Sequence, residues 1–157
     1  MATDVISSGT SAAAGRASTE AVSRRVLALL GRVFFGLIFV LASFQHFTKE
    51  AVGYAASQGT PMAQIAVPLS GVIALIGGVL IIIGYRARLG AWLIVLFLVP
   101  VTLLMHRFWM VSDPIMSRIQ MAMFMKNLSM LGGALLIAYH GAGPLSLDAR
   151  HDQSHSV

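Results

Sequence analysis

The chain has 157 residues, of which 57% are hydrophobic and only 11% are charged, and its formal net charge is +5. An average soluble domain has about 25% charged residues, so this composition indicates a membrane protein. The basic residues are scattered rather than gathered into a stripe with aromatic residues, which argues against nucleic-acid binding. The sequence has no cysteine, so it excludes disulfides, thiolate catalysis and iron–sulfur ligation by this chain.

The N-terminal stretch, residues 1–22, consists mostly of small and polar residues. Because it has little apolar surface to bury, it predicts a disordered tail. The first apolar block begins near Val26 and is longer than the core of a typical signal peptide. This length favours a retained membrane anchor over a cleaved signal.

Four apolar blocks follow the tail, and each is close to the length of about 20 residues that a helix needs to cross a bilayer core. Sequences that favour turns or helix ends separate the blocks, and the last block ends at HGAGP. The sequence therefore predicts an all-α fold, namely a four-helix transmembrane bundle with a disordered N-terminal tail. The blocks lie at residues 26–44, 65–83, 89–105 and 119–139.

The start of the fourth helix has a recognisable local signal. In the sequence SDP, Ser112 or Asp113 can cap the helix while Pro114 occupies the first helical position. We accordingly divide the chain into a disordered cytoplasmic tail at residues 1–22, a four-helix membrane domain at residues 23–143 and a polar C-terminal tail at residues 144–157.

The distribution of basic residues predicts the orientation in the membrane. Basic residues concentrate in the cytoplasmic flanks of membrane helices, so the more basic side is expected to be cytoplasmic. With the N-terminus inside, the inner flanks hold Arg16, Arg24, Arg25, Arg86, Arg88 and Arg150, and the outer flanks hold Lys49, Arg107 and Arg118. We therefore expect both termini to be cytoplasmic.

Three stretches carry a family resemblance: RVFFGLIFVLASFQHF, GVIALIGGVLIIIGYRARLGAW and FMKNLSMLGGALLIAYHGAGPLSLD. Together they span about residues 26–148 and resemble the DoxX family of small bacterial membrane proteins. The resemblance implies a four-helix protein of the bacterial cytoplasmic (inner) membrane. It also implies, for members with a role, quinone-linked oxidation of sulfur compounds or the handling of oxidative stress. Relatives often carry an acidic residue before the second-span glycine pair, where this chain has Ala74.

Two basic residues lie within the predicted spans, and no Asp or Glu lies in any of the four blocks. We expect Arg32 to reach the inner interface, because helical side chains tilt toward the helix N-terminus. Lys126 lies about 10 Å inside the outer end of its helix. It can reach that interface too, or it can serve a polar site near it, where Glu50 and Asp113 are the nearest acidic candidates.

Several residues with hydrogen-bonding or aromatic side chains converge on the outer side in the predicted topology. A lone interfacial histidine is usually a hydrogen-bonded or solvated residue, and a haem or metal site would need further ligands that the sequence does not offer. A quinone head group needs an apolar slot with one or two hydrogen-bond donors at each carbonyl. The predicted quinone-binding residues are His46, His106, Trp109, Lys126 and Asn127.

The leading hypothesis is an integral membrane subunit of a quinone-linked redox complex, with its polar site near the outer membrane face. The alternative is a non-catalytic membrane anchor or assembly partner for another protein. A small transporter is disfavoured, because no charged pair or pair of broken helices marks a path at the midplane. Besides the lipid bilayer, we expect a protein partner or a homo-oligomer and no nucleic acid; the sequence assigns no catalytic or metal-binding residue.

Overall fold

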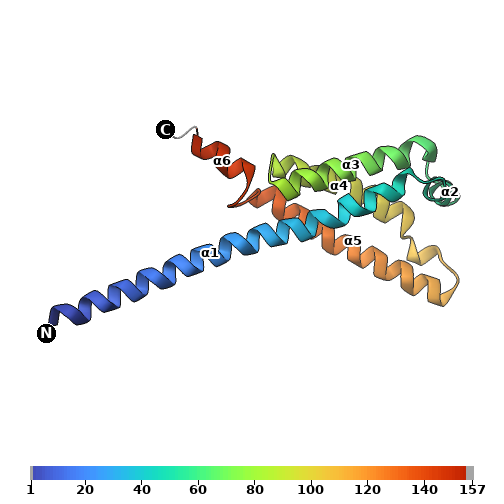
Figure 1. The fold of residues 1–157 in the computed structure, drawn as a ribbon. Coiled ribbons are helices and arrows are strands. Elements are labelled where there is room, and N and C mark those ends of the chain that lie inside the picture. The colour runs from blue at the N-terminus through green and yellow to red at the C-terminus, as the bar shows by residue number, and fades with distance from the viewer. Residues whose placement is uncertain (1, 155–157) are drawn as a thin grey trace.

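The computed structural model describes residues 2–154, which form α-helices and short 3-10 turns with no strand (Figure 1). Four of its helices are long and apolar enough to cross a membrane. The predicted all-α fold with four transmembrane helices is therefore confirmed. These helices are α1 (Ala2–Ser43), α3 (Ala63–Ile83), α4 (Ala87–Met105) and α5 (Pro114–His140).

Helix α1 extends N-terminally beyond its apolar span, which begins at Ser18. The structure has residues 2–22 as helix where the sequence predicts a disordered tail. This stretch is rich in alanine, the best helix former, and it projects away from the other helices (Figure 1). Figure 1 shows no other helix packed against this N-terminal part of α1, so disorder of the tail stays a prediction. Residue 1 lies outside the described residues.

The spans pack in the order α1, α3, α4 and α5, so that α3 lies between α1 and α4 and α5 packs along α4. Glycines allow the closest of these contacts. A Cβ added to Gly78 would lie 2.9 Å from the carbonyl oxygen of Gly36, and one added to Gly77 would lie 2.9 Å from that of Gly90. Close backbone approach through small residues is the usual way in which membrane helices associate.

Helices α1 and α5 meet at one point and then separate. At this crossing a Cβ added to Gly133 would lie 2.7 Å from Cε2 of Phe35. Beyond it the two helices diverge toward the end of the bundle that carries α2 (Lys49–Ser57), which we call the α2 end (Figure 1). The opposite end carries α6 (Leu147–Ser154) and is called the α6 end.

Arg32 is buried within α1, with 4% of its surface exposed, and backbone carbonyl groups surround its guanidinium. Its Nη2 donates to the oxygen of Leu145 at 2.9 Å, its Nε donates to Ile82 at 3.4 Å, and its Nη1 donates to Ala142. The side chain extends to the ends of α3 and α5, and it stays a prediction that this end lies at the inner interface, but carbonyl groups of the protein and not water bind the guanidinium. Residues 141–148, which we call the C-terminal latch, fold back over the guanidinium and satisfy it inside the protein.

A second set of contacts fastens the C-terminal latch to the turn between α3 and α4. The Asp148 carboxylate accepts hydrogen bonds from the backbone N–H groups of Arg86 at 2.7 Å and Ala87 at 3.0 Å, where α4 begins. Gly84 has a φ of +67°, and an added Cβ would lie 2.5 Å from that of Ser146. Residues 144–148, predicted to belong to a polar tail, thus pack onto the membrane domain.

Replacing Arg32 with Met should destabilise the protein, because carbonyl groups from α3 and from the C-terminal latch lose their donor. Hydrogen bonds to a charged group contribute roughly 1.5–3 kcal/mol, so we expect a loss of at least about 2 kcal/mol of unfolding free energy in mild detergent. Arg24→Met, at an exposed position of the same helix, should change it by less than about 0.5 kcal/mol. Equal effects of the two substitutions would contradict a structural role for Arg32.

Candidate functional site

A hydrogen-bond chain links three helices at the α2 end. Nδ1 of His106, which follows α4, lies 2.7 Å from Oε1 of Gln120 in α5, and Nε2 of Gln120 donates to the hydroxyl oxygen of Tyr54 in α2 at 3.2 Å. Because an amide oxygen only accepts, Nδ1 of His106 carries the proton. In the neutral ring this leaves Nε2 of His106 as an acceptor, and the hydroxyl proton of Tyr54 is left as a donor.

An aromatic cluster lies beside this chain and includes η2 (Phe108–Met110). The ring of Trp109 lies 5.0 Å from that of Phe108 and 5.9 Å from that of Phe124, between centroids. Phe124 follows Gln120 by one helical turn, so the cluster and the hydrogen-bond chain share one side of α5. Trp109 remains 56% exposed, as is typical of tryptophan at a membrane interface.

His46 lies in η1 (Phe44–Phe47), directly after α1, and is half-buried. Its ring centroid is 5.4 Å from that of Phe97 in α4, and a Cβ added to Gly71 of α3 would lie 2.6 Å from the His46 Cβ. Nδ1 of His46 is 3.1 Å from the carbonyl oxygen of Ala42, so this nitrogen donates and Nε2 is an acceptor.

Lys126 and Asn127 are neighbours in α5 but face in different directions. Asn127 is 4% exposed and lies on the buried side of the helix, whereas Lys126 is exposed. Within residues 18–151, no hydrogen bond or ion pair from the Lys126 side chain is present, so the expected pairing with Glu50 or Asp113 is not made. Asp113 instead caps α5 by accepting from a backbone N–H, which confirms the predicted helix start.

Lys126 and His46 face different neighbours. Lys126 is two turns from Gly133 and shares its face, whereas His46 lies in a 3-10 turn and packs against Gly71 of α3 and Phe97 of α4. By helix rise, Lys126 lies about 10 Å and His46 about 16 Å beyond the crossing, both toward the α2 end. The Lys126 side chain tilts toward the α2 end, which reduces the difference in depth between its ammonium group and His46.

We call the diverging region beyond the Phe35–Gly133 crossing the α1–α5 seam. Lys126 borders it on α5, and His46 lies at its α2 end, where it packs against α3 and α4. His106 and Trp109 belong to the cluster at the end of the bundle. In the described part of the chain, no hydrogen bond or ring contact joins His46 to His106. The predicted site residues are therefore distributed over two neighbouring regions, with Asn127 on the buried face of α5.

Gln120 and Tyr54 are site residues that the sequence reasoning missed. The available signal for Gln120 was its position within an apolar span, on the same face as Phe124 and Asn127. Tyr54 had no comparable signal, because its contact with α5 joins segments far apart in the sequence. Among the residues with described side chains, no group of three or more His, Cys, Asp or Glu could hold a metal ion.

Comparison with known proteins identifies relatives of the chain. The sequence model of the DoxX family matches residues 27–107. The inner membrane protein YphA of Escherichia coli (strain K12) is 33% identical over 131 residues, which are 82% of this chain and 92% of that protein. No solved structure is significantly similar.

The hydrogen-bond chain predicts coupled mutational effects. Gln120→Leu removes the acceptor of His106 and the donor to Tyr54, so it should lower the unfolding free energy by about 1 kcal/mol. Combined with Tyr54→Phe, it should show a coupling energy of at least about 0.5 kcal/mol in a double-mutant cycle. Gln45→Leu is the matched control, because Gln45 is exposed and takes no part in this hydrogen-bond chain. Strictly additive effects would mean that the Gln120–Tyr54 contact contributes nothing.

Proposed function

We propose, because this chain belongs to the DoxX family of membrane proteins, that it is the integral membrane subunit of a quinone-linked redox complex. Its four apolar helices make it a multi-pass membrane protein. The name of its relative YphA supports placement in the bacterial inner membrane. A partner would oxidise sulfur compounds and pass the electrons to the quinone, or would take electrons from the quinol to reduce oxidants, since this chain has no cysteine.

The observation that carries the proposal is the α1–α5 seam, where the exposed side chain of Lys126 borders α5 and His46 lies at the α2 end of α1. Quinones reach membrane proteins through the bilayer, so a site between two lipid-facing helices needs no passage from water. Ile38, on the same side of α1 as Phe35, is 41% exposed and provides apolar surface. Few polar groups in an otherwise apolar site are typical of cofactor binding.

Lys126 and His46 would interact with the head group in different ways. When bound, the quinone would supply two-electron, two-proton chemistry that the side chains of this chain lack. Lys126 has only donors and can hydrogen-bond to a quinone carbonyl oxygen. His46 donates from Nδ1 to the carbonyl oxygen of Ala42, so Nε2 of its neutral ring would accept from a hydroxyl group of the reduced quinol instead of binding a quinone carbonyl. The chain from His106 to Tyr54 offers further proton-exchanging groups at the α2 end.

An assembly role is the second candidate, and Lys126 favours it. Within the four spans of the described residues, Glu20 near the start of the first span is the single acidic residue, so no acid lies at the depth of Lys126. A partner helix with Asp or Glu at that depth would neutralise the lysine, whereas a second copy in symmetric contact would bring lysine against lysine. A heteromeric partner therefore suits this position better than a homo-oligomer.

The quinone proposal predicts a specific pair of losses. His46→Phe keeps an aromatic ring and Lys126→Met keeps the chain length, but each removes one polar contact. Loss of about 1.4 kcal/mol corresponds to tenfold weaker binding, so we expect the quinone retained per protein to fall about tenfold in each variant. Extraction and chromatography of protein purified in mild detergent would measure it. His140→Phe and Lys49→Met, at exposed positions away from the seam, are the matched controls and should retain quinone.

Two results would decide against this assignment. If both seam variants retain quinone at the control level, the seam does not bind the head group. If Lys126→Met also loses a co-purifying membrane protein that Lys49→Met keeps, the assembly role accounts for the lysine. Lys126→Arg helps to separate the two, because it keeps the charge but changes the reach and the hydrogen-bond geometry.

The proposed orientation has both termini in the cytoplasm, which places the α6 end inside and the seam in the outer half of the membrane. It rests on the greater number of arginines at the α6 end, including Arg86, Arg88 and Arg150. A reporter that works only in the cytoplasm should be active when fused to the C-terminus. A reporter inserted near Gly59 should lie on the external side. An external C-terminal reporter would reverse the orientation.

A further inference from the structure

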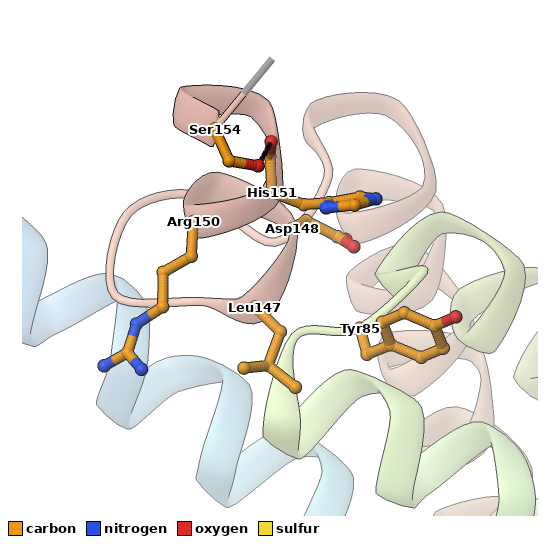
Figure 2. Close-up of a pocket in the computed structure, with 6 residues that line it drawn as sticks. All are labelled: Tyr85, Leu147, Asp148, Arg150, His151 and Ser154. Atoms are coloured by element: carbon orange, nitrogen blue, oxygen red, sulfur yellow. Dashed lines mark hydrogen bonds between the residues drawn. The ribbon is translucent and has the colours of Figure 1, made fainter. Parts of the chain in front are cut away.

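A shallow, open depression of about 440 Å³ lies at the α6 end, between α6 and the turn from α3 to α4 (Figure 2). It is at the opposite end of the bundle from α2, and nothing in the proposed quinone chemistry uses it (Figure 1). Its lining consists of Tyr85, Leu147, Asp148, Arg150, His151 and Ser154.

The lining changes from apolar to polar with distance from the membrane helices. Tyr85 comes two residues after the end of α3, Leu147 begins α6, and each side chain is 44% exposed. Figure 2 shows these two residues nearest the transmembrane helices, whereas His151 and Ser154 lie farther out on α6. This arrangement matches the boundary at which lipid acyl chains give way to head groups.

Arg150 lines the depression and Arg86 follows the lining residue Tyr85 in the chain, and neither guanidinium has a carboxylate partner in the described residues. Both oxygens of Asp148 already accept hydrogen bonds from the backbone N–H groups of Arg86 and Ala87. The Arg86 guanidinium carbon lies 5.8 Å from the ring centroid of Tyr85. In the part of the chain that the structure describes, neither the Arg86 nor the Arg150 guanidinium makes a hydrogen bond or ion pair. Two positive charges therefore remain available to an anion.

We propose that this depression binds the phosphate of an anionic phospholipid. A guanidinium can donate two parallel hydrogen bonds to phosphate, and Arg150 and Arg86 present this group beside apolar surface. Tyr85 and Leu147 then contact the glycerol and the first methylene groups of the lipid. Basic pockets at the ends of membrane helices suit anionic head groups in this way. Soluble phosphate also offers negative charge but lacks the glycerol and methylene groups that would contact Leu147.

The bound lipid would stabilise the contact between the C-terminal latch and the α3–α4 turn, because the residues that bind it come from α6 and from that turn. Arg150 is on α6, and Tyr85 and Arg86 are on the α3–α4 turn. A ligand that binds only the folded arrangement raises the stability of that arrangement. Anionic lipid should consequently raise the thermal unfolding midpoint of the protein.

The test titrates the full-length protein in uncharged detergent with phosphatidylglycerol, phosphatidylcholine or inorganic phosphate and measures the unfolding midpoint. We expect a saturable increase with phosphatidylglycerol, none with phosphatidylcholine and a much smaller one with phosphate. Arg150→Gln should weaken the phosphatidylglycerol effect about tenfold. Arg24→Gln, which removes an exposed positive charge from the same end but outside the depression, should leave it unchanged. Leu147→Ser should weaken the lipid effect and leave any phosphate effect intact.

Three outcomes would overturn the proposal. Equal weakening by Arg24→Gln and Arg150→Gln would indicate a diffuse attraction to anionic lipid rather than a site. An equal response to phosphatidylcholine would remove the role of charge. A full response to inorganic phosphate, unaffected by Leu147→Ser, would assign the site to soluble phosphate instead of lipid.

Discussion

The buried guanidinium of Arg32 is the constraint on which the arrangement of the helices depends. A cation inside a membrane bundle is costly unless hydrogen-bond acceptors surround it, and here the acceptors are main-chain carbonyl groups of Ile82, Ala142 and Leu145. These groups belong to α3 and to the C-terminal latch, so α1 can bury Arg32 only when both are in place. Phe35, which marks the crossing with α5, is less than one turn further along α1. The buried cation thereby helps to fix where α1 and α5 cross.

The position of that crossing determines what the rest of the membrane domain can present to lipid. Because α1 and α5 touch at Phe35 and Gly133 and then diverge, the faces beyond the crossing remain without a protein neighbour on that side. Lys126 lies on such a face of α5, although most of the exposed surface of the spans is apolar. A lipid-soluble head group and an acidic partner helix are two ways of satisfying polar groups at this place.

The sequence predicted the features that depend on local pattern and missed those that depend on tertiary contact. Hydropathy located the four spans, and Asp113 caps α5 as its local sequence indicates. The partners of Arg32 were not predicted, because they are carbonyl groups that any residue provides and no side-chain pattern reveals them. Gln120 and Tyr54 were missed for a related reason, because neither residue alone indicates that α5 contacts α2. Lys126 was recognised as unusual, but its direction became clear only from the crossing at Gly133.

Photolabelling of the protein in its own membrane with an azido-quinone, followed by peptide mapping, tests most directly whether the α1–α5 seam takes a quinone head group. The seam assignment predicts adducts on α1 and η1 between Phe35 and His46 and on α5 near Lys126, and unlabelled quinone should suppress them. Suppressible adducts confined to other segments, or none at all, would contradict it.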